Sequence, residues 1–271
     1  MRRSLPLLIF ILLIANTLFA QIFRFGVPNL EAEDKALYRF GFSLGIDIVD
    51  VNLKTVSNYK DLISDELNNE LKEIYSQIVP AFNVGIIANL RLGEYFDLRF
   101  IPSFSIAHDI NLWYRFENPI NDPNREKTTS SLILRKIECH YVNFPLFVKF
   151  KSSRMHNVRI YALAGGQIGV NMMSTKNNKI PNIDPNGVGA EILPVIKPYD
   201  VQVKGGFGFD FYTTFFKCST EFKVAFGVIN MLEDVKKIND KGNINNYKNS
   251  PVYSGIQSLK SKTFTISVMI E

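Results

Sequence analysis

Residues 40–51 read FGFSLGIDIVDV, and apolar and polar side chains alternate along this stretch. Successive side chains of a strand point to opposite faces, so a period of two predicts a β-strand rather than a helix. One face carries Phe40, Phe42, Leu44, Ile46 and Ile48, and the other carries Gly41, Ser43, Gly45 and Asp47. The stretch therefore predicts a strand with one apolar face and one polar face.

The same alternation recurs in seven further segments of similar length. They are residues 81–92, 95–107, 137–150, 158–171, 201–212, 216–228 and 259–270, of which 137–150 is the least regular. Strands of about 10 residues match a tilted crossing of the hydrocarbon layer of a membrane. The eight segments therefore predict an all-β protein built from strands of membrane-spanning length.

The connections between these segments alternate in length. Short connections lie around residues 93–94, 152–157 and 213–214, and between them lie stretches of roughly 20–30 residues rich in Asn, Asp, Lys and Pro. Outer-membrane barrels have short periplasmic turns and long extracellular loops. We therefore expect an eight-stranded antiparallel transmembrane β-barrel with both chain ends on the periplasmic side.

The polar face of the predicted strands carries charges of both signs. We expect them to point into the lumen and to pair across it as a structural charge network of Asp47, Arg91, Asp97, Arg99, Lys149, Arg159, Lys204, Asp210, Lys217, Glu221 and Lys223. Eight strands enclose a space just wide enough for side chains to fill, which predicts a plugged barrel rather than a diffusion pore. The alternative is a soluble β-sandwich or lipocalin-like barrel with the Phe-rich face packed inside.

Bulk composition leaves both alternatives open. The hydrophobic content is 46% and the mean hydropathy is +0.01, as expected when apolar and polar residues alternate. Aromatic residues make up 13% of the chain, with 22 Phe and 11 Tyr, and aromatics favour strands and membrane interfaces. The aromatic content agrees with a barrel in a membrane.

The N-terminus predicts export. Arg2 and Arg3 precede a short apolar run from Leu5 to Ala15, and Leu18-Phe19-Ala20 suits cleavage before Gln21. The alternative is an uncleaved membrane anchor, but this run of roughly 15 residues is short against the ~20 that span a bilayer. We expect a cleaved signal peptide at 1–20, a periplasmic segment at 21–38 and the barrel at 39–271, in the outer membrane of a Gram-negative bacterium.

The charge pattern gives no support for binding of nucleic acid. The net charge is +5, and removal of the two arginines of the leader leaves +3 (5 − 2). Basic residues do not gather with aromatics on one face. We therefore expect membrane lipid rather than nucleic acid or a small-molecule substrate as a partner.

Catalytic, cofactor and metal motifs are not found in the sequence. The spacing of His108, His140 and His156 fits no metal site, and no Gly-x-Ser-x-Gly elbow exists. Cys139 and Cys218 fall on opposite faces of non-neighbouring strands, with Cys139 inward and Cys218 toward lipid, so we expect no disulfide. We expect no enzyme activity, no cofactor and no metal.

One loop contains a possible helix. Leu67, Leu71, Ile74 and Tyr75 stand at helical spacing among charged residues in the first long connection. This stripe predicts a short amphipathic helix at the outer rim, which either packs on its own loop or meets a partner.

Several strands resemble the PorT family of the type IX (Por) protein secretion and gliding-motility machinery. The resemblance is carried by the hairpin LRLGEYFDLRFIP at 90–102, by NFPL at 143–146 and KFKS at 149–152, by GFGFDFY at 206–212 with FK at 216–217 and STE at 219–221, and by LKSK at 259–262. It covers nearly all of the mature chain, and strands better than loops. The hairpin is fairly specific, whereas the Gly-Phe-Gly-Phe pattern recurs in many small barrels.

The resemblance implies a non-enzymatic outer-membrane component required for type IX secretion, with other type IX secretion components as partners. The C-terminal residue departs from the usual pattern of outer-membrane barrels, which end on an aromatic residue that the insertion machinery recognises. This chain ends on Ile270-Glu271.

Two other functions fit a small barrel. One is a structural or adhesive barrel whose long loops bind external partners. The other is a lipid-modifying acyltransferase or hydrolase, for which the sequence offers His108-Asp109 near the end of a strand but no nucleophile beside it. A polar pair at a strand end explains these two residues equally well.

Overall fold

The structure is a computed structural model of the chain, and it describes residues 29–30, 35–55, 70–117, 131–173, 196–232 and 256–271. Regular structure in these ranges is β-sheet, in strands β1 to β12. No helix among the described residues is long and apolar enough to cross a membrane. The expected signal peptide at 1–20 and most of the expected periplasmic segment at 21–38 lie outside the described residues.

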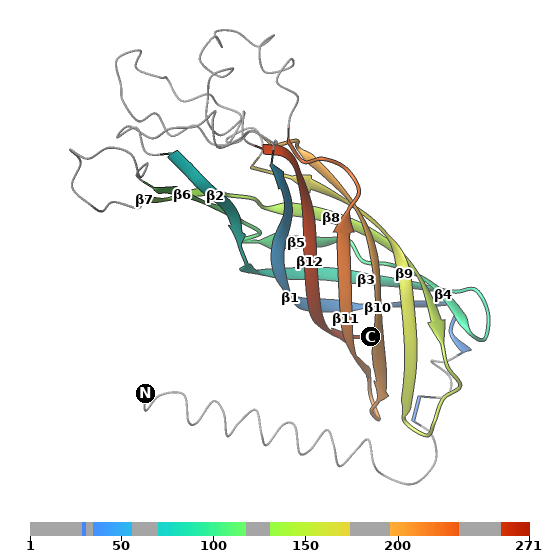
Figure 1. Cartoon of the computed structure of the whole chain (residues 1–271). Coiled ribbons are helices and arrows are strands. Elements are labelled where there is room, and N and C mark those ends of the chain that lie inside the picture. Colours follow the sequence, from blue (N-terminus) through green and yellow to red (C-terminus); the bar gives the residue numbers. More distant parts are fainter. Residues whose placement is uncertain (1–28, 31–34, 56–69, 118–130, 174–195, 233–255) are drawn as a thin grey trace, which may run out of the picture.

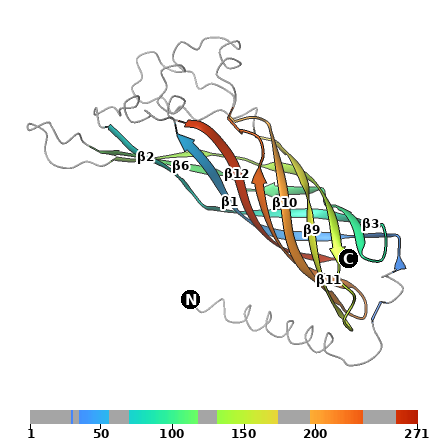
Figure 2. The same ribbon diagram turned by 45° about the vertical axis from the view of Figure 1, so that its right-hand side comes forward.

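The larger sheet closes on itself, because β1 pairs with both β12 and β3. Its strands are β1 (Tyr38–Thr55), β3 (Val79–Arg91), β4 (Phe96–Phe100), β5 (Ser103–Ile106), β8 (Tyr141–Lys151), β9 (Val158–Asn171), β10 (Tyr199–Tyr212), β11 (Lys217–Gly227) and β12 (Ile256–Ile270). β4 and β5 are two parts of one strand, since both lie between β3 and β8. The ring therefore has eight antiparallel positions, which confirms the expected architecture (Figures 1 and 2).

The interruption between β4 and β5 falls at Ile101-Pro102. Proline has no N–H to donate, so it disturbs a ladder of hydrogen bonds. The Pro102 carbonyl nevertheless accepts a hydrogen bond from the backbone N–H of Ile86 (3.0 Å), and the N–H of Ile101 donates to the carbonyl of Pro145 (3.2 Å). Both neighbours remain attached through the break, so the wall of the barrel stays closed.

The apolar face of the wall points outward. On β1 the apolar side chains from Phe40 to Ile48 are between 70% and 36% exposed, whereas Ser43 and Asp47 on the opposite face are buried. The other strands of the ring repeat this arrangement, with exposed Phe82, Val84, Phe104, Phe144, Leu146, Val148, Ile168, Phe207, Phe226, Ile266 and Val268. A soluble β-protein would bury these side chains, so the burial pattern excludes the soluble alternative.

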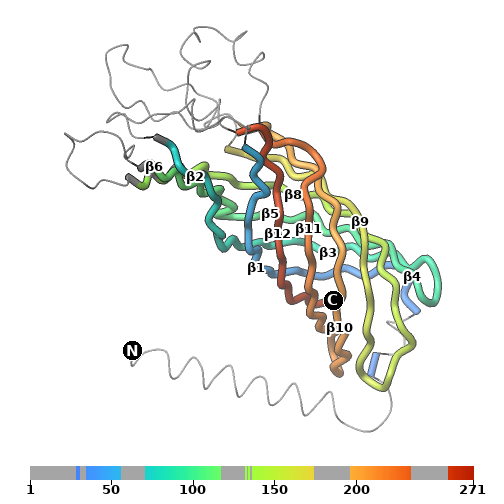
Figure 3. Tube along the Cα trace, in the orientation of Figure 1, coloured from blue at the N-terminus to red at the C-terminus, as the bar shows by residue number. Residues whose placement is uncertain are grey.

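A second sheet stands beyond one rim of the barrel. It consists of β2 (Glu70–Gln77), β6 (Ile110–Glu117) and β7 (Ser131–Ile137), in the order β2-β6-β7. Along the chain, β2 directly precedes β3, β6 follows β5, and β7 precedes β8. The three strands project past the ends of β1 and β12 (Figures 1 and 3). We call them the protruding sheet. The sequence predicted long loops here, with a short helix in the first, and for the parts of the connections that form strands the loop prediction is wrong.

The predicted amphipathic helix is also wrong. Leu71, Ile74 and Tyr75 lie in β2, and Leu67 lies outside the described residues. The pairing of β2 with β6 shifts between Leu71 and Glu73, as expected of a β-bulge. A bulge adds one residue to a strand and changes the face of those that follow. Leu71 and Ile74 therefore share the buried face of a strand although they are three residues apart, which imitates the spacing of a helix.

The buried face of the protruding sheet is apolar. Together with residues at the ends of the neighbouring strands it forms a cluster that we call the mouth cluster: Val51, Leu71, Ile74, Ile110, Leu112, Tyr114, Phe116, Ile137, Cys139, Tyr141, Ile196, Met231, Ile256 and Leu259. The polarity of the two faces is thus reversed relative to the barrel wall. Apolar residues face inward at the mouth, and outward along the barrel.

On the strand that runs from β5 into β6, this reversal falls at residues 107–109, where the regular strand is interrupted. Ala107 has a φ of 59°, a left-handed conformation that L-residues other than glycine adopt at a cost of about 1–2 kcal/mol. Before it, Phe104 and Ile106 point outward and are exposed; after it, Ile110 and Leu112 point inward and are buried. All four positions are even-numbered, so the face that an even-numbered residue occupies changes across this interruption.

The opposite rim of the barrel carries the short turns and the C-terminus (Figure 1). Here Asn29 donates hydrogen bonds from its backbone N–H to Asn157 Oδ1 (3.0 Å) and from Nδ2 to the carbonyl of Tyr212 (3.3 Å). The guanidinium of Arg154 lies 3.8 Å from the ring centroid of Tyr212 and donates to the Asn29 carbonyl. The chain preceding β1 is therefore attached to the β8–β9 turn and to the end of β10.

Candidate functional site: the charge network of the lumen

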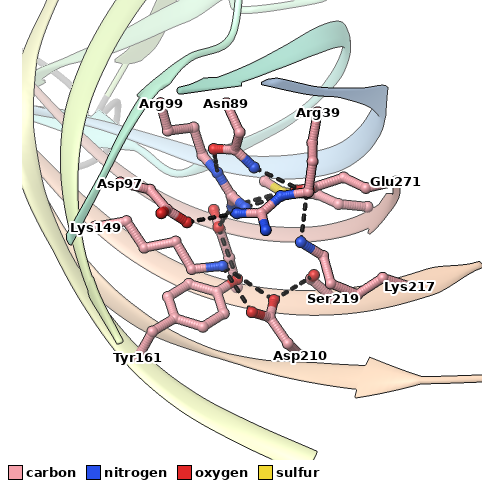
Figure 4. Close-up of polar contacts among 12 residues, drawn as sticks. Arg39, Asn89, Asp97, Arg99, Lys149, Tyr161, Asp210, Lys217, Ser219 and Glu271 are labelled. Carbon is pink, nitrogen blue, oxygen red and sulfur yellow. Dashed lines mark hydrogen bonds and ion pairs between the residues drawn. The ribbon is translucent and has the colours of Figure 1, made fainter. Parts of the chain in front are cut away.

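Charged side chains fill the lumen near the rim that carries the short turns. We call the following set the lumen network: Arg39, Asn89, Asp97, Arg99, Lys149, Lys151, Tyr161, Asp210, Lys217, Glu221 and Glu271. All occupy inward positions of their strands. Every one of the eight positions of the ring contributes, from Arg39 on β1 to Glu271 directly after β12. The network therefore crosses the whole section of the barrel (Figure 4).

Arg99, on β4, lies at the centre of this network. Its side chain is 0% exposed and forms ion pairs with Glu221 on β11 and with Glu271 (Nη2 to Oε1, 2.6 Å). Its Nε donates to Asn89 Oδ1 at 2.8 Å. A buried arginine is tolerated only when its charge and its donors are satisfied. Here three side chains on three sides of the lumen satisfy this one guanidinium.

A second group surrounds Lys149. Its ammonium lies 2.8 Å and 3.1 Å from the two carboxylate oxygens of Asp210 and 3.4 Å from the ring centroid of Tyr161. The Tyr161 hydroxyl donates to Glu221 Oε1 at 2.8 Å, which joins this group to Arg99. Gly208 opposite makes room for the tyrosine, because a Cβ there would lie 2.5 Å from the Tyr161 ring and hydroxyl. The lack of a side chain at Gly208 thus allows the Tyr161 ring to contact Lys149 while its hydroxyl reaches Glu221.

The third group lies closest to the rim. The Asp97 carboxylate forms ion pairs with Arg39 Nη2 (2.7 Å, to Oδ2) and with Lys151 Nζ (2.6 Å, to Oδ1). Lys217 Nζ forms an ion pair with Glu271 Oε2 at 2.5 Å. The backbone of Glu271 also pairs with that of Lys217 in both directions, at 2.8 Å and 2.9 Å. The residue with which the chain ends therefore has two structural roles. Its backbone extends the sheet, and its carboxylate belongs to the lumen network.

The lumen nearer the mouth is held by hydroxyl groups rather than by ion pairs. Asp47 Oδ1 accepts from Thr265 (2.5 Å), and Asp200 Oδ2 accepts from Ser261 (2.5 Å) and Gln202 (2.7 Å). The Lys204 side chain is buried here as well. Beyond this layer the mouth cluster begins, so the described lumen changes from ion pairs through hydroxyls to apolar packing.

The structure places most of the residues predicted for the network inside the barrel. Nine of them are buried: Asp47, Asp97, Arg99, Lys149, Lys204, Asp210, Lys217, Glu221 and Lys223. Arg91 is half-buried and its Nε donates to the carbonyl of Gly93 in the β3–β4 turn (3.1 Å). Arg159 is half-buried near the ring of Tyr212, at 5.7 Å from the centroid. These two arginines thus lie at the rim.

Four charged residues of the lumen were not predicted from the sequence, namely Arg39, Lys151, Asp200 and Glu271. The alternation of faces would have found Arg39, Lys151 and Asp200. Arg39 shares the inward face with Asp47, Lys151 with Lys149, and Asp200 with Lys204. Each expected strand began or ended one residue short of these positions, so the charges nearest to the rims were left out.

The pair His108-Asp109 does not form an isolated dyad. Asp109 Oδ1 accepts a hydrogen bond from the backbone N–H of Cys139 (3.2 Å), and Oδ2 lies 3.1 Å from the ammonium of Lys136. The hydrogen bond between the Lys136 ammonium and the Asp109 carboxylate raises the pKa of Lys136, which lies on the protruding sheet. The His108 ring instead packs edge-on against Tyr141, 5.1 Å between centroids. The contacts are those of a structural pair at a strand end.

The two cysteines do not form a disulfide. Cys139 is buried, Cys218 is half-buried, and both are free thiols. Within the described ranges, no group of three or more His, Cys, Asp and Glu side chains could hold a metal ion.

A family model described as an outer membrane protein beta-barrel domain matches residues 19–233. Neisserial surface protein A (NspA) from Neisseria is 10% identical with a TM-score of 0.36, over 86% of this chain and 97% of that one. The outer membrane protein OprG from Pseudomonas aeruginosa is 10% identical with a TM-score of 0.39, over 87% and 93%. Among curated protein sequences, none matches significantly.

Proposed function

This chain belongs to the family of outer membrane proteins with a beta-barrel domain, and we propose that it is a non-enzymatic component required for type IX protein secretion. In this proposal the barrel contributes to the assembly or function of the translocon and does not itself conduct the secreted protein. Its partners are other components of that secretion system, which it meets through its outer surface, its turns or its protruding sheet.

The observation that carries a scaffold role is the closed lumen. The lumen network draws on all eight positions of the ring, and Asp97, Arg99, Lys149 and Glu221 in it are 0% exposed. A secreted polypeptide would have to break all of these buried ion pairs in order to pass. Such pairs, once separated without replacement partners, cost several kcal/mol each. The barrel therefore acts through its surfaces rather than through its interior.

The assignment to type IX secretion is supported by the sequence segments that resemble the PorT family. The hairpin at 90–102 supplies Asp97 and Arg99 to the lumen network, and the segment 206–212 supplies Asp210. The quoted segments thus coincide with the strands that hold the network together. A non-enzymatic role is supported by Asp109, which is bound by Lys136 and by the backbone of Cys139 instead of by His108.

Deletion of the gene in its host tests the proposal. Proteins of the culture medium and of the periplasm are compared between the deletion strain and the parent, while the heat-modifiable gel mobility of the barrel is followed in outer-membrane fractions of the parent. We expect type IX cargo to accumulate in the periplasm of the deletion strain and to return to the medium on complementation. Normal secretion in the deletion strain would contradict the assignment.

A second candidate function is binding of external partners, and the protruding sheet favours it. Tyr75, Trp113 and Leu134 stand opposite one another on three neighbouring strands, on the outward face. Tyr75 and Leu134 are 39% and 40% exposed, and Trp113 Nε1 donates to Gln77 Oε1 at 2.8 Å. We call these three residues the outer row. An exposed apolar row on a sheet that stands beyond the barrel is typical of an interaction surface.

Complementation with a variant of the outer row separates the two functions. Tyr75→Ser, Trp113→Ser and Leu134→Ser are combined in the deletion strain, and folded barrel in the outer membrane is confirmed by heat-modifiable mobility. Restored secretion would show that type IX function does not use the outer row. Lost secretion with a folded barrel would place the function on the external face.

A further inference from the structure

The outward face of β1 and β12 changes character sharply near the protruding-sheet end of the barrel. Along most of its length this face is apolar and exposed, up to Ile48 on β1 and Phe264 on β12. Beyond that level it carries lysines, with Lys262 and Lys260 on β12 and Lys54 on β1. The change marks the level at which the wall leaves the hydrocarbon, since an outward charge within the layer is destabilising.

The strand register places the three lysines close together. Lys262 stands opposite Asp50, Lys260 opposite Asn52, and Lys54 opposite Ser258. Alternate residues of a strand lie about 7 Å apart, and neighbouring strands about 4.8 Å apart. The three lysines therefore rise from one patch roughly 14 Å long, which we call the lysine patch.

The positive charge of the lysine patch is not balanced within the described part of the chain. No ion pair joins Lys54, Lys260 or Lys262 to a carboxylate of the described residues, although four lysines of the lumen each pair with one. Asp50, the carboxylate beside the patch, uses Oδ1 to accept hydrogen bonds from the Val51 N–H (2.8 Å) and the Ser76 hydroxyl (2.7 Å). Among the described residues, three lysines therefore stand against the one carboxylate of Asp50, and the net positive charge of the patch favours an anionic ligand.

The lysines cannot turn inward to avoid the membrane surface. At the same level the inward positions are Val49, Val51, Leu259, Ser261 and Thr263, which are all buried in packed protein, so the inward side offers no open space for a lysine. Flanking Lys262 on the other side is Phe226 of β11, which is 57% exposed on the outward face. Long basic side chains in such a setting extend along the apolar surface and hold the charge at the interface.

We propose that Lys54, Lys260 and Lys262 bind the phosphate groups of the anionic glycolipid of the outer leaflet, while its acyl chains lie on the apolar wall below. Two observations select a lipid as the ligand. The lysine patch is continuous with the lipid-facing wall, and it lies at the end of the barrel opposite to the short turns and the C-terminus, the end that faces the cell exterior in outer-membrane barrels. This inference does not depend on the proposed role in secretion.

Binding of lipopolysaccharide to the full-length barrel in neutral detergent micelles tests the proposal. The probes are lipopolysaccharide, the same lipid after removal of its phosphates, and inorganic phosphate as a competitor. We compare the wild type with Lys54→Gln/Lys260→Gln/Lys262→Gln, with the corresponding triple arginine variant, and with Lys72→Gln/Arg115→Gln/Lys136→Gln. The last variant removes three outward basic residues from the protruding sheet and is matched in charge. Native mass spectrometry gives the affinity, and heat-modifiable mobility confirms folding of each variant.

We expect the wild type and the arginine variant to bind the phosphorylated lipid, and the glutamine variant of the lysine patch to bind roughly 100-fold more weakly, at about fivefold for each lysine. The variant of the protruding sheet should bind as the wild type does, and removal of the phosphates should abolish the difference. Equal binding by the wild type and the glutamine variant would overturn the proposal, and so would an equal loss in the variant of the protruding sheet. Displacement of the lipid by an equimolar amount of inorganic phosphate would show that the lysine patch binds free phosphate rather than the lipid, and this would also overturn the proposal.

Discussion

β5 and β6 follow one another along the same strand of the wall, yet they present opposite chemistry to their surroundings. On β5 the exposed side chains are Phe104 and Ile106, and the buried one is Ser105. On β6 the buried side chains are Ile110, Leu112, Tyr114 and Phe116, and the exposed one is Arg115. The first segment is built for an apolar environment outside and a polar lumen, and the second for water outside and an apolar core.

The difference shows that the environment, rather than strand propensity, selects the face. A strand in lipid must satisfy its backbone within the sheet and can leave phenylalanine outside, because the lipid is as apolar as the side chain. A strand in water gains free energy only by turning its apolar face to other protein atoms. The reversal near Ala107 on this strand, and near Lys262 on β12, therefore indicates where the wall passes from lipid into water.

The largest effect is expected from Arg99→Ala, which tests the inner face of the barrel. The substitution leaves Glu221 and Glu271 buried without this partner, and removal of one member of a buried ion pair destabilises by about 3–5 kcal/mol. Urea titration of the barrel refolded in lipid vesicles measures the loss. Arg115→Ala, on the exposed face of β6, is the control and should leave the transition unchanged. An equally small effect at both arginines would contradict a lumen held by ion pairs.

Two leucines on outward faces test the outer environment directly. Leu44 lies at the middle of the apolar face of β1 and is 60% exposed, and Leu134 lies on β7 and is 40% exposed. Leu44→Arg should cost about 2–4 kcal/mol because the arginine enters the hydrocarbon near its midplane. Leu134→Arg should have little effect, since that residue faces water. The same titration measures both variants, and similar losses at the two positions would mean that both segments share one environment.

The smallest effect concerns two hydroxyls on the inward face of β12. Thr265 donates to Asp47 at 2.5 Å, whereas the buried Ser267 hydroxyl has no hydrogen-bond partner among the described residues. Thr265→Val should destabilise by about 1–3 kcal/mol, because a buried carboxylate loses a donor. Ser267→Val should change stability by less than about 1 kcal/mol in either direction. A larger loss for Ser267→Val than for Thr265→Val would show that the hydroxyl layer is wrongly assigned.

The sequence was sufficient for the barrel because its signal is periodic. The strand expected at residues 158–171 coincides with β9, and the expected outward residues of β1, β8 and β12 are exposed. The inward charges followed from the same parity. The extent of the network did not, because strand ends carry no clear signal: β10 begins at Tyr199 and not at 201, so Asp200 was overlooked.

The protruding sheet escaped prediction for two physical reasons. The bulge between Leu71 and Glu73 and the interruption at residues 107–109 each shift the period by one residue, and such a shift breaks the alternation on which the prediction depends. The reversal of polarity also hid the strands of the protruding sheet, because β6 turns its apolar side chains inward whereas β5 turns them outward. The role of Glu271 could not be foreseen either, since its partners Arg99 and Lys217 come together only in the closed barrel.

The most direct test of this account uses Trp113, the one tryptophan of the chain, which lies on the outward face of β6. Its fluorescence is measured in vesicles with brominated lipid chains and, separately, with acrylamide in the water. We expect quenching of Trp113 by acrylamide and none by brominated chains, because β6 faces water. We expect the reverse for the variant Phe104→Trp/Trp113→Phe, which moves the tryptophan to the outward face of β5. Strong quenching of Trp113 by brominated chains would place β6 inside the hydrocarbon and contradict the change of environment between the two strands.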